Sequence, residues 1–480
     1  MRLLALALVV EAFLILASQS DMSASDPLAY AENAYSIQDH PGAYFAAPPD
    51  HPFVMRLGLT VPLAGVYRVF GVGTLTTAAI PLVAALAILV AVFLAVPPGR
   101  ARVFALLFGV AAMPLVRYGS VLGVDVPCTA LLAWSLLLLA RRERGRHVLA
   151  GAMALWFAAF LVKESAIWCA PAWLYAAVSD SREAGWRATL RAYLPALAAG
   201  AVLAASYLWL CDHLWGNPLA RFAGVQELAN EHSWSLAGKP AGVWLRRLTW
   251  GPPLLLLTTF GPALLLALLA PRHLPRPARV WAVATLSIVA LFWFGSASTA
   301  SYDPLPLMQR MLLPALPGVV VLAAFAAERY VRRPAAIALV VAAAVVPFLV
   351  AVVPHLFPAR PETAAYAALR ADVARGPVVL VCGDLRCPWV TAYHFGFRPP
   401  PTLTVVEAPA FAAAPPPAGA RVRVLVNRAR ARYLQATYGE GSPTNDAIAK
   451  LHLPILVDGG DVQLHDAGDG AALHAALGSR

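Results

Sequence analysis

Long apolar runs separated by short polar loops dominate the chain up to about residue 356. A membrane-spanning helix needs roughly 20 mostly apolar residues, and on that basis the pattern predicts eleven spans. Several runs are short, so their helices would extend into the flanking residues or tilt little. The predicted spans are about 3–17, 72–96, 102–122, 126–140, 148–162, 165–178, 192–211, 252–270, 280–297, 308–327 and 334–355.

Arginine clusters occupy alternate loops, whereas the loop 18–52 has no Lys or Arg at all. Cytoplasmic loops of membrane proteins carry an excess of these residues. We therefore expect a cytoplasmic N-terminus, with loop 18–52 and the C-terminal segment outside. The basic clusters are Arg100 with Arg102, Arg141–Arg146, Arg182–Arg191, Arg272–Arg279 and Arg329–Arg333.

The same rule interprets two ambiguous stretches. Residues 148–178 could form one long helix, but basic loops flank both ends, so we expect a hairpin with Lys163 and Glu164 at its outer tip. A span at 53–70 would invert every later loop, so this stretch is expected to lie in the outer interface as an amphipathic helix. The first apolar run could also be a cleaved signal peptide, against which Glu11 argues.

The segment 357–480 has a different character. Short β-prone runs at 377–382, 402–407, 421–426 and 454–457 alternate with helical patterns at 361–375, 428–438 and 443–451, and a Pro-rich loop is expected at 408–418. These elements predict a small α/β domain outside the membrane, following a membrane domain at 1–356 with outer loops 18–70 and 212–250. Cys382 and Cys387 in this segment could form a local disulfide or remain two thiols.

Composition narrows the class of protein. Of the 480 residues, 60% are hydrophobic and 13% charged, and the mean hydropathy is +0.66. One water-soluble core cannot bury so much apolar surface, which excludes a soluble enzyme, a disordered chain and a secreted disulfide scaffold. The net charge of +11 is explained by the loop arginines rather than by nucleic acid. The sequence predicts a polytopic α-helical membrane protein.

Two carboxylates are candidates for chemistry. Asp26 follows the first span at once, so it would lie at the outer membrane surface, where it could accept a proton from an acceptor hydroxyl. Asp125 comes at the outer end of a later helical hairpin, on the same side. Each could instead only cap the helix that follows it, and the two roles are compatible.

Two cations are expected near the same outer interface. Lys163 and Arg310 would need anions there, and a phosphate-linked lipid headgroup would supply one. Alternatively Lys163 pairs with Glu164 or a nearby carboxylate, and Arg310 with Asp303 or lipid phosphate. Loop 212–250 mixes aromatic and polar residues, as sugar contacts or an ordinary interfacial belt would. No nucleotide-binding loop, His-rich cluster or nucleophile elbow appears in the sequence.

Five short motifs, in order across about residues 20–330, carry a family resemblance. They are Asp26-x3-Tyr30-x3-Ala34; His51-Pro52 with Arg56-Leu57-Gly58 and Val69-Phe70-Gly71; Asp125-Val126-Pro127; Leu149-Ala150-Gly151 through Phe160-Leu161-Val162-Lys163; and Gln309-Arg310-Met311-Leu312-Leu313-Pro314 with Pro317. With these motifs the chain resembles the lipid-phosphate-sugar-dependent glycosyltransferases of the GT-C fold, in the branch of protein O-mannosyltransferases and bacterial aminoarabinose transferases.

The resemblance implies a GT-C-like enzyme of a bacterial inner membrane. It would move a sugar from a polyprenyl-phosphate donor to a lipid, glycan or protein acceptor on the periplasmic side, with inversion at the anomeric carbon. Asp26 would be the general base and Asp125 would orient the acceptor or the base. Mg²⁺ is left open, because two carboxylates could hold it but cations could do the same work. The implied substrate-binding residues are Tyr30, His51, Arg56, Lys163, Glu164 and Arg310.

Other functions would fit the same composition. A ligase or polymerase of lipid-linked glycans belongs to the same class of enzyme. A flippase or transporter for lipid-linked intermediates would keep the basic pocket without needing a catalytic carboxylate, and a non-catalytic assembly subunit would tolerate substitution of Asp26. Many transporters have internal repeats and broken spans in matching positions; the sequence shows neither.

Overall fold

The structure is a computed structural model, described here for residues 1–22, 24–46, 53–231, 239–270, 274–296, 302, 304–438, 448 and 450–478. The chain forms two compact units. The first contains Met1–Gln19, Ser36–Arg68 and Ala78–Leu356, and the second contains Ser20–Tyr35, Val69–Thr77 and Phe357–Arg480. Two short segments from the N-terminal part of the chain therefore pack with its C-terminal part.

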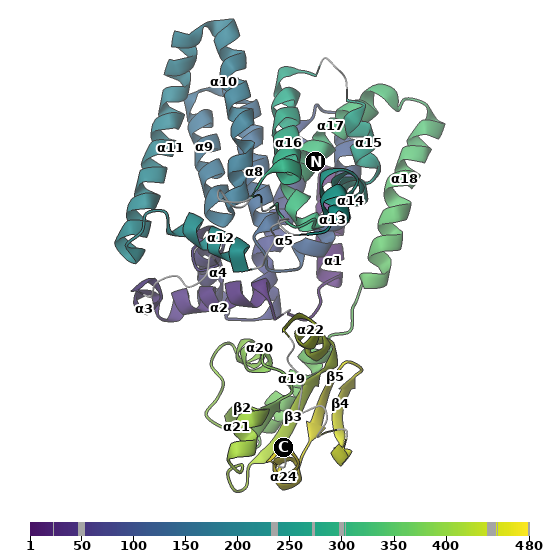
Figure 1. Ribbon diagram of the computed structural model, residues 1–480. Coiled ribbons are helices and arrows are strands. Elements are labelled where there is room, and N and C mark those ends of the chain that lie inside the picture. The colour runs from purple at the N-terminus through teal and green to yellow at the C-terminus, as the bar shows by residue number, and fades with distance from the viewer. Residues whose placement is uncertain are drawn as a thin grey trace. The chain divides into compact units, whose positions relative to one another are not determined.

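The described elements up to residue 356 are all helical (Figure 1). They are α1 (Arg2–Ala17), α2 (Asp26–Asp39), α3 (Pro41–Ala46), α4 (Leu57–Phe70), α5 (Thr74–Ala95), α6 (Arg100–Val110), α7 (Met113–Gly119), α8 (Asp125–Ala140), η1 (Arg142–Arg144), α9 (Arg146–Val162), η2 (Glu164–Cys169), α10 (Ala170–Ala184), α11 (Trp186–Trp215), α12 (Ala220–Glu231), α13 (Ala241–Leu248), α14 (Gly251–Phe260), α15 (Pro262–Leu268), α16 (Arg276–Phe294), η3 (Gln309–Ala315), α17 (Leu316–Tyr330), α18 (Pro334–Val352) and η4 (Val353–His355). Each predicted span falls on one of these helices or on a pair of them.

Fewer of these helices are long and apolar enough to span a membrane than the eleven spans that the sequence pattern predicted. Within the described residues, five helices are long and apolar enough to cross a membrane, or up to seven if each bent pair counts as one span. The bent pairs are α6 with α7, at 52°, and α14 with α15, at 109°. The chain is a multi-pass membrane protein, and the number eleven stays a prediction.

The stretch 148–178 is confirmed as a helical hairpin. Lys163 is extended, with φ −151° and ψ 136°, and separates α9 from η2 and α10. The indoles of Trp156 and Trp173, on either side of this break, stack with ring centroids 5.7 Å apart. The chain therefore folds back on itself at Lys163 and Glu164, as the distribution of arginines predicted.

Helices α16 and α17 approach each other closely at a glycine. A Cβ atom on Gly318 would lie 1.8 Å from Oγ1 of Thr285 and 3.2 Å from the carbonyl oxygen of Trp281. Trp281 is fully buried. The missing side chain of Gly318 lets the two backbones touch, and this contact places η3, directly before α17, against the bundle.

The second unit contains a five-stranded sheet in the order β2-β1-β3-β5-β4. Strands β2, β1 and β3 are parallel, and β5 pairs antiparallel with both β3 and β4. Sequence reasoning found all but β5. The strands are β1 (Val378–Cys382), β2 (Leu403–Glu407), β3 (Arg421–Asn427), β4 (Ile455–Gly459) and β5 (Val462–Asp466).

Helices cover both faces of this sheet (Figure 1). On one face, alternate valines of β1 and β3 pack against Phe411 of α21 (Ala408–Ala413) and Leu473 of α24 (Ala471–Gly478). The other face carries α19 (Pro361–Val373) and α20 (Cys387–His394), and α22 (Arg428–Tyr438) follows β3. The first half of the predicted loop 408–418 is thus helix α21. The predicted α/β domain is confirmed as a small sheet domain at the C-terminus.

Candidate functional site

Asp125 and Lys163 form a buried ion pair in the first unit. Asp125 is the first residue of α8, and Nζ of Lys163 donates a hydrogen bond to its Oδ1. Their side chains are 9% and 10% exposed. The sulfur of Met311, from η3, lies 3.2 Å from the same Nζ. The N-cap position of α8 is Val124 rather than Asp125, and the side chain of Asp125 pairs with the cation.

Glu164, the neighbour of Lys163, binds two arginines instead. Its Oε1 lies 3.0 Å from Nε of Arg221 and 3.7 Å from Nε of Arg56. Burial alone would raise the pKa of this carboxyl, but the two guanidinium groups hold it at about 2. Arg56 reaches Glu164 because Gly58, at the start of α4, allows a contact that a Cβ would block at 2.7 Å from the amide nitrogen of Val162.

Arg310 belongs to the same neighbourhood. It lies in η3 next to Met311, the residue that contacts Lys163. The charges of Arg310 and Asp125 both act on the hydroxyl of Tyr118, which lies in α7. The structure therefore brings together Arg56, Asp125, Lys163, Glu164 and Arg310, which the sequence analysis named one by one; we call these residues and Arg221 the charged cluster.

Sequence reasoning missed Arg221 and Arg247, both from loop 212–250. Arg221 is 1% exposed, and its guanidinium lies 4.7 Å from the ring centroid of Phe160. Arg247, on α13, is 4% exposed and donates from Nη2 to the carbonyl oxygen of Phe292. The amphipathic pattern of α13 could have separated buried Arg247 from exposed Arg246, its neighbour in the sequence.

The guanidinium of Arg247 is incompletely satisfied. Among the residues that the structure describes, no group accepts a hydrogen bond from its Nε or Nη1. The ring of Tyr302 stacks with Trp244, which lies on α13 like Arg247, with ring centroids 6.0 Å apart. The hydroxyl of Tyr302 also has no hydrogen-bond partner among the described residues. A buried guanidinium with unused donors is costly unless an anion binds it. Arg247 is thus equipped to hold an anionic ligand.

A second network lies at the opposite end of α8. Beyond that end, Arg142 makes two 2.8 Å hydrogen bonds to Asp180, which also accepts one of 2.6 Å from Arg276 and one of 2.9 Å from Tyr193. The 16 residues of α8 rise about 24 Å from one end to the other. The two charged groups therefore lie near opposite ends of the helical unit, and the Asp180 network is fully occupied by its own partners.

The other predicted site residues lie elsewhere. Asp26 is the first residue of α2 and half-buried, and Tyr30 one turn later is 1% exposed. Both belong to the second unit. His51 lies outside the described residues. In the described part of the chain, no three His, Cys, Asp or Glu side chains come together as metal ligands would, and Asp125 and Glu164 are each paired with cations.

A helical unit combined with a small α/β unit is a fold that the chain shares with solved structures. The chain is similar to two crystal structures of ArnT from Cupriavidus metallidurans, each at 14% sequence identity over 98% of this chain and 97% of the other. The TM-score is 0.61 for the apo state and 0.55 for ArnT bound to undecaprenyl phosphate. The resemblance found in the sequence motifs is thereby confirmed at the level of the fold.

No protein-family model matches the chain. No curated protein matches it either. At this identity, the site residues rest on their own geometry.

Proposed function

We propose that the protein is an integral-membrane glycosyltransferase that moves a sugar from a polyprenyl-phosphate donor to a lipid, glycan or protein acceptor. The observation that carries the proposal, on a chain of this fold, is the buried guanidinium of Arg247, two of whose donors have no acceptor among the described residues. A phosphate presents several acceptor oxygens in a geometry that suits a guanidinium. One of the fold relatives is itself described as bound to undecaprenyl phosphate.

The donor phosphate is assigned to the cations of the first unit. Arg247 binds it directly, and Lys163 and Arg310 lie in a cluster that stabilises the negative charge developing on the leaving group. Asp125 fixes the position of the Lys163 ammonium. Glu164, kept ionised by Arg56 and Arg221, ties the start of α4 to the end of α9.

Asp26 is assigned the role of general base. The acceptor oxygen attacks the anomeric carbon and gives its proton to the Asp26 carboxylate, while the bond from that carbon to the phosphate oxygen breaks. The polyprenyl phosphate leaves with the bonding electrons, and direct attack inverts the configuration. Tyr30 and His51 are assigned to substrate binding, and the role of Mg²⁺ is left to the assay.

The proposed location is the periplasmic face of a bacterial inner membrane. Cys382 and Cys387 are joined in a disulfide, and disulfides persist mainly in oxidising compartments such as the periplasm. Both cysteines lie in the second unit, together with Asp26. This supports transfer on the outer side, where the arginine distribution also puts loop 18–52.

The test uses purified protein in lipid with a panel of radiolabelled polyprenyl-phosphate sugars. Asp26→Asn should bind the donor and fail to transfer the sugar. Arg247→Gln should bind polyprenyl phosphate at least about tenfold more weakly, because a charged hydrogen-bond pair contributes about 1.5–3 kcal/mol. Arg246→Gln, which changes the exposed arginine beside it on α13, should behave as wild type.

Two results would overturn the proposal. If Arg247→Gln and Arg246→Gln bound polyprenyl phosphate equally well, Arg247 would not be the donor site. If wild type bound donors but neither released nor transferred any sugar, with Mg²⁺ or without it, a flippase or an assembly subunit would be the better reading.

A further inference from the structure

The second unit holds the chain on both sides of Asp26. Before it, the carboxylate of Asp21 accepts hydrogen bonds from the amides of Glu362 and Thr363 at 2.9 and 3.2 Å, and from Oγ1 of Thr363 at 2.6 Å. These amides open helix α19, so Asp21 caps that helix from a remote part of the sequence. The cap fixes the chain five residues ahead of Asp26.

Further contacts follow closer to Asp26 and beyond it. The carbonyl oxygen of Ala24 accepts a 2.6 Å hydrogen bond from Arg386. The carboxylate of Glu32 accepts one of 2.9 Å from the indole of Trp389. The ring of Tyr35 stacks on Phe397 with centroids 5.1 Å apart. Arg386, Trp389 and Phe397 belong to α20 and its flanks, so this one helix contacts the chain just before α2 and the second and third turns of α2.

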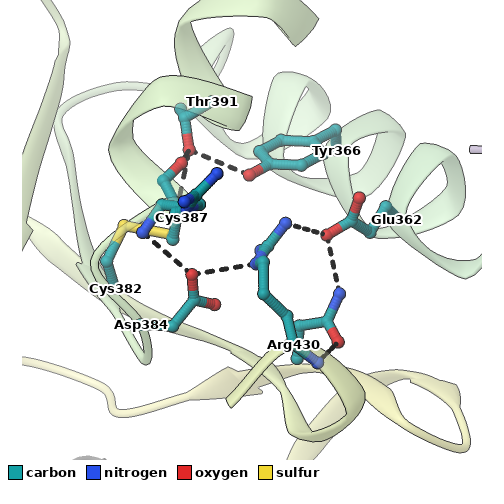
Figure 2. Close-up of a disulfide and its surroundings, with 9 residues drawn as sticks. Glu362, Tyr366, Cys382, Asp384, Cys387, Thr391 and Arg430 are labelled. Atoms are coloured by element: carbon teal, nitrogen blue, oxygen red, sulfur yellow. Dashed lines mark hydrogen bonds and ion pairs between the residues drawn. A yellow bond between two sulfur atoms is a disulfide. The ribbon is translucent and has the colours of Figure 1, made fainter. Parts of the chain in front are cut away.

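A buried ion network of Asp384, Arg430 and Glu362, which Figure 2 shows, links Arg386 to the cap of Asp21. Arg430, whose side chain is 9% exposed, lies 2.8 Å from Asp384 and 2.8 Å from Glu362. Asp384 in turn accepts a hydrogen bond of 3.0 Å from the amide of Arg386. The contacts form a closed ring that runs from Asp21 through these residues to Arg386 and Ala24.

The disulfide closes the turn that contains Asp384 and Arg386. Cys382 ends β1 and Cys387 begins α20, and both are buried. A crosslink over a five-residue separation restricts the backbone of the turn, so the guanidinium of Arg386 projects from a fixed base. Figure 2 shows the disulfide beside Asp384, with Arg430 on the other side of that carboxylate.

We propose that Arg386 and Trp389, held by the Cys382–Cys387 disulfide and the buried Asp384–Arg430–Glu362 network, are positioning residues for Asp26. These contacts, all within the second unit, set the position of the Asp26 carboxylate and do not involve the cations assigned to the donor phosphate. This inference rests on the proposed role of Asp26. Its consequence is a selective loss of kcat when the hold on Ala24 or Glu32 is weakened.

The experiment compares Arg386→Ala, Arg386→Lys and Trp389→Phe with a matched control, Arg432→Ala. Arg432, two residues after Arg430 on α22, is paired with Asp461 at 2.9 Å; both side chains are exposed, and this ion pair includes none of the ring residues. Arg386→Ala and Trp389→Phe should lower kcat at least about tenfold, because small displacements of a catalytic group are costly, while KM for the donor and polyprenyl-phosphate binding stay within twofold. Arg386→Lys should recover most of kcat, and the control should match wild type.

The outcomes separate this inference from the proposed function. If Asp26→Asn abolishes transfer but Arg386→Ala and Trp389→Phe keep wild-type kcat, the positioning role of Arg386 and Trp389 is overturned, while the role of Asp26 as general base is retained. If Asp26→Asn remains active, the base itself is wrong. Loss of phosphate binding in parallel with kcat would show a general structural role and would also overturn the inference.

A second variant tests the disulfide without touching Arg386. Cys382→Ser/Cys387→Ser should lower kcat in the same selective way, with donor binding retained, because the turn bearing Arg386 gains freedom. Substituting buried Cys169, a free thiol of the first unit, by Ser provides the comparison. Equal kcat in the disulfide variant and the wild type would remove the disulfide from the positioning role.

Discussion

Lys163 and Glu164 are adjacent in the sequence yet serve different partners. The sequence offered Glu164 as one anion for Lys163, whereas the structure pairs Lys163 with Asp125, 38 residues away, and Glu164 with Arg56 and Arg221. The extended backbone at Lys163 sends the two side chains in different directions. Burying an unpaired charge is costly, so each of these buried charges is expected to have an oppositely charged partner. Which residue is that partner depends on tertiary packing, which the sequence pattern does not reveal.

Removing one partner of the Asp125–Lys163 ion pair should destabilise the protein more than removing both. Lys163→Met leaves the Asp125 carboxylate buried without its cation, which should lower the free energy of unfolding by about 3–5 kcal/mol. Lys163→Met/Asp125→Asn should recover much of that loss. Chemical unfolding in detergent measures both. Equal stability of the single and double variants would show that the pair is not energetically coupled.

His394 should make the second unit sensitive to acid. Burial, with the charges of Arg370 and Arg430, lowers the pKa of this imidazole from 6.5 to about 3. The unfolded chain therefore takes up the proton first as pH falls. The stability contributed by His394 is complete above pH 6.5 and is lost toward pH 3, at up to about 1.4 kcal/mol per pH unit.

The ring of His394 stacks on Tyr366 at 4.1 Å, so His394→Phe keeps the contact and removes the titration. Its melting temperature should fall less than that of the wild type between pH 6.5 and pH 4. Comparing the two proteins also cancels the opposite trend expected from Glu362, whose pKa burial raises. Parallel pH curves would contradict the prediction.

At the scale of elements, apolar runs located the spanning helices of the first unit but not α12 and α13 within loop 212–250, and β-prone runs located β1 to β4. The bends were not predicted: the 109° turn between α14 and α15 occurs within one continuous apolar run, where Gly261-Pro262 was the available break signal. Strand β5 was missed because Val462–Asp466 alternates polar and apolar residues over only five positions. Helix α20 begins in a Cys-Pro sequence that reads as a turn.

The crossing of α16 and α17 should be intolerant of any side chain at Gly318. Gly318→Ala would force a methyl group into Thr285 and should cost about 1–3 kcal/mol of stability. Gly65→Ala, within α4 and with no atom within 4 Å of the added methyl, should be neutral or slightly stabilising. Thermal unfolding of both variants in one detergent decides this, and a neutral Gly318→Ala would show that the crossing is looser than described.

At the scale of the whole molecule, the two units are interleaved along the chain. The segments 20–35 and 69–77 belong with the C-terminal sheet domain, although their composition gave no sign of it. Their ties include polar contacts of Asp21, Glu32 and Thr77 and the stacking of Tyr35 on Phe397. Hydrophobic periodicity does not register such long-range contacts, so the sequence assigned both segments to the membrane domain by position alone.

The proposed topology predicts opposite accessibility for two exposed arginines. Arg432→Cys, in the second unit, should react with a membrane-impermeant maleimide in right-side-out vesicles. Arg144→Cys, in the basic turn after α8, should react only after the membrane is opened. The three free cysteines are buried and should contribute little background. Labelling of Arg144→Cys in sealed vesicles would reverse the orientation.

The cap of Asp21 on α19 also imposes an order in time. Asp21 and Glu362 are 341 residues apart, and a ribosome adding 5–20 residues per second needs roughly 17–70 s to make that stretch. During this interval the spans are synthesised, while α19 and α20, which the segment carrying Asp26 contacts, do not yet exist. A nascent chain that stops before α19 would contain the residues of the charged cluster but would leave the segment with Asp21 and Asp26 without its contacts to α19 and α20. The arrangement around Asp26 can therefore form only when the last part of the chain has been translated.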